Sequence, residues 1–364
     1  TLATVMNDAP FNYANGRPVN NWWGSEYRGL NSLRTAIAQS MNIIAVKTLT
    51  QITPQLGFDY LKNFGFTTLA HGTEADTDAN GNVFTDANLP TALGGLTYGV
   101  KNVELCAAYA AIANGGNYIK PVYYTKILDH NGNVLIENNS VGRSVIKETT
   151  AYLLTSALED VVQNGTGTAC QLDNMPVAGK TGTTEAYNDL WFVGYTPYYT
   201  CAVWSGYDNN EKLPDYARNF HKALWKKVMT RIHEGLPSKE FEKPASVEKL
   251  SVCEETGLLP RAGCPVITEY FDVGTMPTEY CDQHFYDSDD YDYNYDTDSS
   301  DQTDNTTDTD NSENSDNGDT DNSGDSNNTD DNGNSGDDGT DNTGGSDDNG
   351  DGNEDDSSYQ VDYY

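Results

Sequence analysis

Apolar side chains recur at helical spacing in several stretches of the chain. In residues 29–49, Leu33 and Ile44 belong to the apolar side of such a pattern, and the spacing predicts a helical region. Gly65 and the run Asn114-Gly115-Gly116 are typical of helix ends. Further helices are expected at residues 56–66, 103–113, 148–162 and 219–232.

Runs of β-branched and aromatic residues predict strands elsewhere in the chain. Residues 118–128 and 134–137 flank His130-Asn131-Gly132-Asn133, a sequence typical of a hairpin turn. Helices first, then three consecutive strands and a final helix, predict an α+β fold with an antiparallel sheet flanked by helices. The three consecutive strands are expected at residues 177–181, 190–195 and 201–204.

Acidic residues are concentrated at the C-terminal end. The chain has 364 residues, of which 56 are acidic and 21 basic, and its formal net charge is −35. Residues 287–364 hold 27 of the acidic side chains, no basic ones and a single aliphatic one, Val361. Such a segment cannot bury enough apolar surface to offset its ordering entropy, so we expect a disordered acidic tail.

These shifts in composition divide the chain into three expected parts. Residues 1–235 form the main domain, 236–286 a small irregular extension with three cysteines, and 287–364 the tail.

The negative charge of the tail argues against nucleic acid and anionic lipid as partners because both would be repelled. The longest apolar stretch, residues 106–113, is far short of the roughly 20 residues that a membrane helix needs. The chain opens in sequence typical of a domain interior, so we expect it to be a fragment.

The first candidate for chemistry is the segment Pro176-Val-Ala-Gly-Lys-Thr-Gly-Thr-Thr184. It places a lysine and a hydroxyl on a predicted strand, and both suit a carboxylate. Gly182 removes a side chain where another backbone would lie alongside the strand. An extended peptide with a free carboxylate is the ligand expected at such an edge. A phosphate-binding loop is excluded because it needs glycine at position 174, which is asparagine.

The second candidate is the run Ala38-Gln-Ser-Met-Asn-Ile-Ile-Ala45. Ser40 and Asn42 interrupt the apolar helical pattern there, so we expect their side chains to face a cleft. Ser-x-Asn alone is a weak signal, since the tail contains Ser312-Glu-Asn314 and Ser315-Asp-Asn317 through composition alone. The apolar context and the order before Lys180 distinguish Ser40.

Together these residues resemble the transpeptidase domain of the class A, bifunctional penicillin-binding proteins. That family carries Ser-x-x-Lys, then Ser-x-Asn, then Lys-Thr-Gly. The resemblance covers roughly residues 1–235 in family order. Its other motifs are Asn21-Trp22, Tyr27-Arg-Gly29, Leu33-Arg-Thr-Ala36, Leu93-Gly-Gly-Leu-Thr-Tyr-Gly99, Ala107-Ala-Tyr109, Ala113-Asn-Gly-Gly116, Gly165-Thr-Gly167 and Gly179-Lys-Thr-Gly-Thr-Thr184.

The resemblance implies a penicillin-binding and serine β-lactamase-like fold and a serine D,D-transpeptidase that forms an acyl-enzyme. Ser40 would relay a proton to the leaving D-Ala nitrogen, and Asn42 would hold the donor amide. Lys180 would bind the terminal carboxylate, and the Thr183 N–H would be an oxyanion-hole donor. The implied catalytic residues of this chain are Ser40, Asn42 and Lys180. The implied substrate-binding residues are Thr181, Gly182, Thr183 and Thr184.

One departure from the family pattern concerns the nucleophile. No Ser-x-x-Lys tetrad precedes Ser40. The two literal matches, Ser144-Val-Ile-Lys147 and Ser246-Val-Glu-Lys249, both follow Ser40 and are therefore out of order. We expect the nucleophile, a glycosyltransferase domain and a membrane anchor to lie upstream of Thr1, and we expect this chain to be inactive alone.

The resemblance also implies a place and a set of partners. The intact protein would work at the extracytoplasmic face of the bacterial plasma membrane, on peptidoglycan stem peptides ending in D-Ala-D-Ala. It would bind β-lactams, would need no cofactor, and would contact the membrane only through the missing anchor. Other proteins of cell-wall synthesis or division are further candidate partners.

The six cysteines leave more than one interpretation open. An extracytoplasmic domain permits disulfides, and six cysteines allow 15 pairings, of which Cys253 with Cys264 is the favoured pair. Cys281-x-x-His284 together with those two cysteines is a less favoured alternative, a zinc-binding set. No metal is expected at the transpeptidase site.

Residues 347–352 resemble the start of a calcium-binding loop. The twelfth position of that loop is Ser358 rather than glutamate, so only diffuse cation binding is expected.

Two other classes of function stay open. One is a noncatalytic peptidoglycan-binding or scaffold module that keeps the strand edge without a nucleophile. The other is a surface interaction protein in which the acidic tail is the working part.

Overall fold

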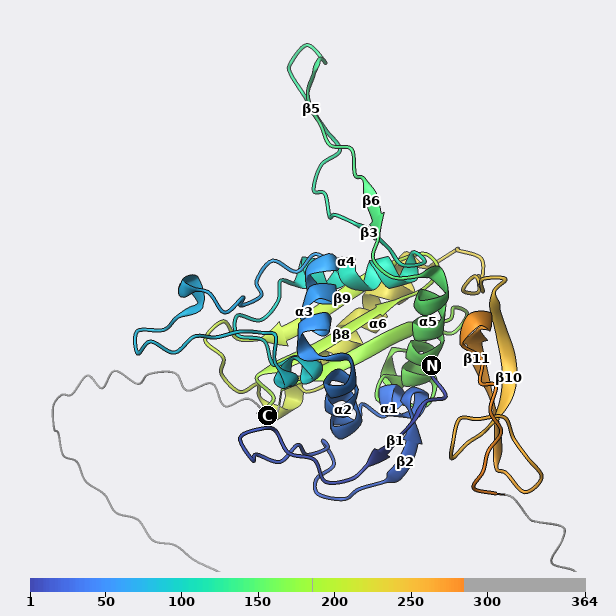
Figure 1. Cartoon of the computed structure of the whole chain (residues 1–364). Helices are drawn as coiled ribbons and strands as arrows, with labels where there is room; N and C mark the ends of the chain where they lie inside the picture. Colours follow the sequence, from blue (N-terminus) through green and yellow to red (C-terminus); the bar gives the residue numbers. More distant parts are fainter. Residues whose placement is uncertain (185, 285–364) are drawn as a thin grey trace, which may run out of the picture. The chain divides into compact units, whose positions relative to one another are not determined.

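The computed structural model describes residues 1–184 and 186–284. At its centre lies an antiparallel sheet of three strands in sequential order (Figure 1). The strands are β7 (Ala178–Thr183), β8 (Asp189–Tyr195) and β9 (Thr200–Gly206). Residue pairs Lys180–Val193 and Phe192–Val203 fix the register of the two pairs of strands. The predicted sheet is confirmed.

Helices cover both faces of this sheet. Successive side chains of a strand point to opposite faces, so apolar side chains lie on each face and pack against helices there. On one face, Phe192 packs with Trp225 and Met229 of α6. On the other face, Ala178 and Tyr195 pack with Leu158 of α5. The covering helices are α4 (Asn102–Ala113), α5 (Glu148–Gln163) and α6 (Phe220–Ile232). The α+β architecture with a helix-flanked antiparallel sheet is therefore confirmed.

The N-terminal region differs from the single helical stretch predicted for residues 29–49. The Ser32 side chain accepts a hydrogen bond from the Thr35 backbone N–H and so caps the first helix. That helix stops at Ala38, and a second begins at Asn42. The elements here are β1 (Val5–Asp8), β2 (Gly29–Ser32), α1 (Leu33–Ala38), α2 (Asn42–Ile52) and α3 (Pro54–Asn63).

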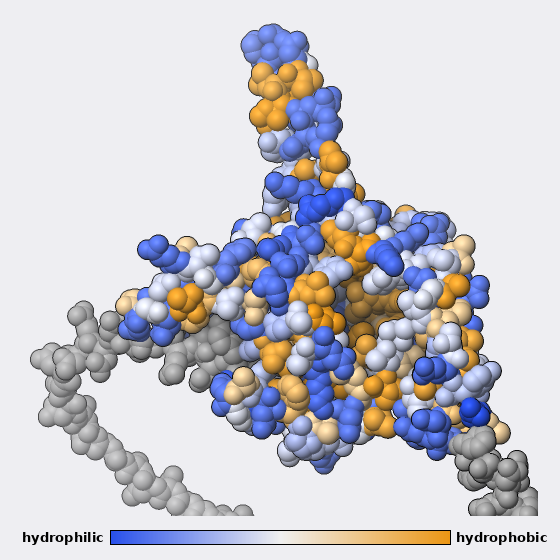
Figure 2. Space-filling view, viewed as in Figure 1, coloured by the Kyte–Doolittle hydropathy of each residue, from blue (hydrophilic) through white to orange (hydrophobic). Residues whose placement is uncertain are grey.

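The remaining short elements connect these layers. The predicted hairpin at residues 130–133 is confirmed as the turn between β4 (Lys126–Leu128) and β5 (Val134–Glu137). Every residue of these two strands is exposed, and Figure 2 shows apolar residues gathered along the hairpin. The other short elements are β3 (Asn117–Ile119), β6 (Gly142–Ser144), and the 3₁₀ turns η1 (Glu74–Asp76), η2 (Leu89–Leu93), η3 (Thr168–Cys170), η4 (Asp215–Ala217) and η5 (Val273–Thr275).

The part predicted to be irregular, residues 236–286, contains a regular antiparallel pair. Its strands are β10 (Val247–Cys253) and β11 (Val266–Asp272). Val252 and Phe271 form a small core with Ala3, and this core attaches the pair to the start of the chain. The acidic tail and the calcium-loop sequence lie outside the described residues. Among residues 1–184 and 186–284, no helix has the length and apolar character needed to cross a bilayer.

An ion-pair network joins the extension to two helices of the main domain. Arg34 of α1 donates from Nε and Nη2 to the two carboxylate oxygens of Glu269 on β11, each at 2.6 Å. Its Nη1 also donates to Asp160 Oδ2 at 2.5 Å and to the Ser156 carbonyl oxygen at 3.1 Å, both on α5. Glu269 is 2 % exposed. The guanidinium is therefore held in a fixed geometry by a buried, bidentate pair.

Candidate active site

Lys180 and Ser40 meet although 139 residues separate them in the chain. The Lys180 ammonium donates to Ser40 Oγ at 2.7 Å and to the Thr181 carbonyl oxygen at 3.1 Å. Lys180 projects from β7 on the same face as Ala178, which α5 covers. Ile37 of α1 packs into that same cluster. The packing of α1 on α5 thus places the end of α1, and Ser40 after it, beside the lysine.

Ser40 lies in a tight turn between α1 and α2, not on a helix. Its φ is 55°, a left-handed conformation that serine rarely adopts. The Met41 backbone N–H donates to the Ala36 carbonyl oxygen at 2.9 Å, which closes the turn. The Trp22 indole donates to the Gln39 carbonyl oxygen at 2.9 Å and holds the turn from outside. Unusual backbone conformations of this kind concentrate at functional sites.

Asn42 is the first residue of α2. Its side-chain amide donates to the Asn20 carbonyl oxygen at 2.9 Å. The neighbouring Asn21 accepts from the Ile43 backbone N–H at 3.3 Å and donates to the buried Asp8 carboxylate at 2.9 Å. The segment that contains Asn20 and Asn21 therefore orients Asn42 and also satisfies the start of the helix.

Burial changes the chemistry of Lys180. It lowers the pKa of the ammonium to about 8 from an ordinary value of 10.5, because few water molecules reach the charged group. No carboxylate is among the hydrogen-bond acceptors that this ammonium contacts in the described part of the chain. A lysine in this state attracts an incoming anion and also exchanges a proton near neutral pH.

The outer edge of β7 carries backbone groups that no described strand pairs. The Thr184 N–H donates across to the Asp189 carbonyl oxygen of β8 at 3.1 Å. Because successive backbone groups of a strand point in opposite directions, the N–H and C=O groups of Thr183 and Thr181 point away from β8. The contact of Lys180 with the Thr181 carbonyl oxygen agrees with this alternation. Within residues 1–184 and 186–284, this edge is unpaired by any other strand, so it suits an extended peptide.

Thr166 is a site residue to which the sequence assigned no role. Its hydroxyl lies 2.7 Å from that of Thr181. A methyl group added at Gly165 would lie 2.2 Å from the Ala38 carbonyl oxygen, so this loop lies directly against the end of α1. The sequence showed the motif Gly165-Thr-Gly167, but only the structure shows that Thr166 contacts Thr181.

The glycine at 182 and the threonine at 184 have structural partners within the sheet. A methyl group at Gly182 would lie 3.2 Å from Cβ of Trp191, its cross-strand neighbour. Among the described residues, the nearest neighbour of a side chain at position 182 would therefore be a residue of the same sheet. The Thr184 hydroxyl accepts from the Asp189 N–H at 2.8 Å at the end of the strand pair. Thr183, between them, is exposed.

The two out-of-order Ser-x-x-Lys matches lie in other elements. Ser144 ends β6 and Lys147 precedes α5, and both are exposed. Ser246 precedes β10 and is exposed, and Lys249 lies over the Tyr270 ring. Neither serine is among the hydrogen-bond partners of Lys180.

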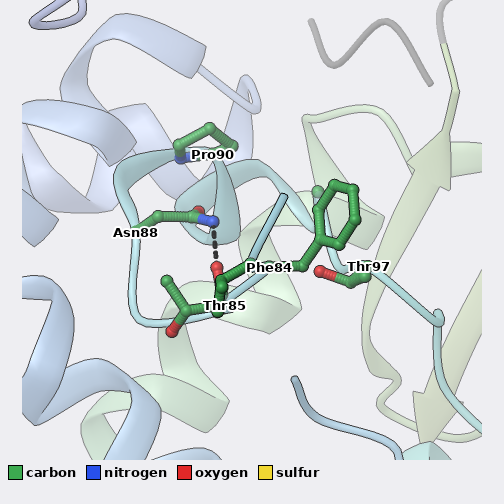
Figure 3. Close-up of a pocket in the computed structure, with 7 residues that line it drawn as sticks. Phe84, Thr85, Asn88, Pro90 and Thr97 are labelled. Carbon is green, nitrogen blue, oxygen red and sulfur yellow. Dashed lines mark hydrogen bonds between the residues drawn. The ribbon is translucent and has the colours of Figure 1, made fainter. Parts of the chain in front are cut away.

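A separate hollow lies in the loop region around η2 (Figure 3). Phe84, Thr85, Asn88, Pro90 and Thr97 line it, and the Asn88 amide donates to the Thr85 carbonyl oxygen at 2.5 Å. It contains no ionisable side chain among its lining residues. These lining residues therefore offer no general acid or base.

Comparison with solved structures supports the fold. Penicillin-binding protein 1A from Haemophilus influenzae superposes with a TM-score of 0.63 at 22% identity, over 77% of this chain and 46% of that one. The penicillin-binding protein PonA1 from Mycobacterium tuberculosis gives 0.57 at 24% identity, over 67% and 66%. PonA1 has also been solved in complex with penicillin V.

Comparison of sequences identifies the family. Penicillin-binding protein 1A of Clostridium novyi is 36% identical over an alignment of 304 residues, which covers 78% of this chain and 33% of the relative. Penicillin-binding protein 1A/1B of Bacillus subtilis is 32% identical, over 75% and 31%. The chain thus spans about a third of the length of these relatives. The penicillin-binding protein 1A C-terminal domain matches residues 243–286. The penicillin-binding protein transpeptidase domain matches residues 1–230, so this chain belongs to the penicillin-binding protein transpeptidase family.

Proposed function

We propose that this chain forms the donor-binding and proton-transfer side of a serine D,D-transpeptidase site. The observation that supports this most is the contact of Lys180 with Ser40 at 2.7 Å, beside an unpaired strand edge. The substrate class is the peptidoglycan stem peptide ending in D-Ala-D-Ala, and β-lactams would occupy the same site. Family membership supports the proposed reaction class, and the geometry supports the roles proposed here for individual residues.

The donor peptide would lie in an extended conformation along the outer edge of β7. Its terminal carboxylate would meet the Lys180 ammonium and the Thr181 hydroxyl, which Thr166 orients. The scissile carbonyl would then lie near the Thr183 N–H, which points away from β8. A backbone N–H in that position would stabilise the oxyanion of a tetrahedral intermediate. Gly182 and Thr184 would shape the strand that the donor follows.

The chemistry needs one serine beyond those described at the site. Its hydroxyl oxygen would add to the penultimate D-Ala carbonyl, and the bond from that carbonyl carbon to the terminal D-Ala nitrogen would break. The proton that the attacking serine loses would pass to the lysine of its tetrad, and Ser40, hydrogen-bonded to Lys180, would relay a proton from that lysine to the nitrogen as it leaves. Asn42 would hold the amide of the acyl donor. The amine of a second stem peptide would then take the acyl group and release the serine.

That nucleophile would belong to a part of the protein that this chain does not contain. The curated relatives are about three times as long as the matched segment, which leaves room for a Ser-x-x-Lys tetrad, a glycosyltransferase domain and a membrane anchor. The protein would then work at the outer face of the bacterial plasma membrane.

A noncatalytic peptidoglycan-binding module is the second candidate. The unpaired outer edge of β7 supports it, since a strand edge by itself suffices to bind a peptide. The two candidates differ in one property: only the first forms a covalent acyl-enzyme.

Replacing Thr181 by valine tests the donor-binding role. In the protein that includes its upstream sequence, we expect the acylation rate with a donor bearing a free terminal carboxylate to fall roughly 10- to 100-fold. A hydrogen bond to a charged group contributes about 1.5–3 kcal/mol, which corresponds to this range. The rate is measured with a thioester donor and with its C-terminally amidated analogue.

The amidated donor is the matched control because it lacks the charge that Thr181 would bind. Its slower acylation should change little in the Thr181→Val variant. Equal losses for both donors would show that Thr181 supports the strand rather than the carboxylate, and the proposed role would then be wrong.

A further inference from the structure

Three cysteines and a histidine of the extension converge on one point. Cys253 ends β10, Cys264 precedes β11, and Cys281 and His284 follow β11. Their three sulfur atoms and one imidazole nitrogen all lie within 4.8 Å of one another. Residues from three separate parts of the chain thus present four metal-ligating atoms to a common centre.

The spacing of these atoms fits a tetrahedral ion. With zinc–sulfur and zinc–nitrogen bonds of about 2.3 and 2.0–2.1 Å, neighbouring ligand atoms lie about 3.6 Å apart. The Cys253 and Cys281 sulfurs lie 3.5 and 3.3 Å from His284 Nδ1. These distances are close to the edges of a tetrahedron that surrounds a zinc ion.

Groups around the cluster orient its ligands. His284 directs Nδ1 to the sulfurs, and its Nε2 lies 3.1 Å from a Glu255 carboxylate oxygen. The Arg261 backbone N–H donates to the Cys264 sulfur at 3.3 Å. A carboxylate on the second imidazole nitrogen is a recurrent outer-shell partner of zinc-bound histidine, and it fixes the tautomer of the ring.

The backbone around the cluster is also held in place. The Cys253 N–H donates to the Leu258 carbonyl oxygen and the Cys281 N–H to the Leu259 carbonyl oxygen, each at 2.8 Å. Cys253 and Cys281 are completely buried. Hydrogen-bonded loops that fix buried ligands are typical of structural zinc sites, in which the protein supplies all four ligands.

Disulfide bonding accounts for this arrangement less well. The favoured pairing of Cys253 with Cys264 is not formed, and all six cysteines are free thiols. A disulfide within this group would leave a third thiol and the oriented histidine without a role. Two of the other cysteines, Cys106 and Cys170, instead donate to backbone carbonyl oxygens at 3.8 Å.

We infer that Cys253, Cys264, Cys281 and His284 bind one structural zinc ion. The ion would join the ends of β10 and β11 to the segment that follows them. Because Val252 and Phe271 of these strands pack on Ala3, the ion would also stabilise the contact between the extension and the main domain.

The zinc content of the whole chain, residues 1–364, tests this inference. The protein is purified with a reductant and zinc, freed of unbound metal, and analysed for metal and for thiol reactivity. We expect one zinc per chain and protection of three thiols until a chelator is added. Cobalt substitution should give the visible absorption of tetrahedral cobalt bound by thiolates, a readout that needs no variant to fold.

Variants locate the ion. Cys264→Ser and His284→Ala should lower zinc retention at least tenfold, whereas the matched control Cys106→Ser should retain one zinc per chain. A chelator should lower the melting temperature of the unaltered chain and of the control. Less than a tenth of a zinc per chain with three reactive thiols, or a disulfide among these cysteines in zinc-containing buffer, would overturn the inference.

Discussion

Replacing Lys180 by methionine is expected to make the fold more stable at pH 7 by about 2 kcal/mol. Burial lowers the pKa of this lysine from 10.5 to about 8, and each pKa unit corresponds to about 1.4 kcal/mol between folded and unfolded states. The pKa difference alone would give a larger gain in the free energy of unfolding. The loss of the hydrogen bond to Ser40 and the partial exposure of Lys180 reduce that gain. Methionine keeps much of the side-chain length and removes the buried charge.

The pH dependence of this gain gives the sharper test. Between pH 8 and 10.5 the unfolded lysine binds more protons than the folded one, so the unaltered protein becomes more stable as pH rises. Below pH 8 both states are protonated, and the penalty of the buried ammonium is constant. The advantage of Lys180→Met should therefore be greatest below pH 8 and shrink toward pH 10.5.

Urea unfolding of the two proteins from pH 6 to pH 10.5 measures this difference. Lys126→Met is a matched control because Lys126 is exposed and, among the described residues, its one ion pair is with Glu137 at 3.5 Å. Its effect should stay within about 0.5 kcal/mol at every pH. A difference for Lys180→Met that does not change with pH would contradict the lowered pKa.

Replacing Glu269 by glutamine is expected to lower the free energy of unfolding by about 3–5 kcal/mol at neutral pH. The substitution conserves shape but removes the charge that faces the Arg34 guanidinium at two points. Of the two carboxylates that Arg34 contacts in the described part of the chain, that of Asp160 then remains. Removing one partner of a buried pair leaves a charge without full compensation, which is strongly destabilising.

Thermal and urea unfolding measure this loss, with Glu137→Gln as the control. Glu137 pairs with Lys126 at the surface of the β4–β5 hairpin, and such pairs contribute little. The control should therefore change the free energy of unfolding by less than about 1 kcal/mol. Equal effects of the two variants would show that the Arg34 network does not hold the extension to the main domain.

The regular part of the fold was predictable because local patterns determine it. Three strands and the helices after Val103 follow from alternation, helical spacing and end signals, and all are confirmed near their predicted positions. The N-terminal helix was predicted as continuous because the apolar positions on both sides of Ser40 are compatible with one helical face. The break depends on a left-handed backbone at Ser40, which tertiary contacts such as that of Trp22 stabilise.

The candidate site was only partly predictable, for a similar reason. Motif order brought Ser40, Asn42 and Lys180 to attention, but sequence spacing carries no information on which groups meet. The position of Thr166 and the orientation of Asn42 depend on contacts between distant segments. The cysteine cluster likewise depends on loops that fold back to a common point, and the sequence left a disulfide and a zinc site as alternatives.

The central proposal is that this chain supplies one side of a serine transpeptidase site and that the nucleophile precedes it. Intact-mass analysis after incubation with benzylpenicillin tests it most directly, on this chain and on the same chain preceded by its natural upstream sequence. We expect a single penicilloyl adduct on the longer protein, at a serine before Thr1, and none on residues 1–364 alone. A stable adduct on the shorter chain, or none on the longer one, would contradict the proposal.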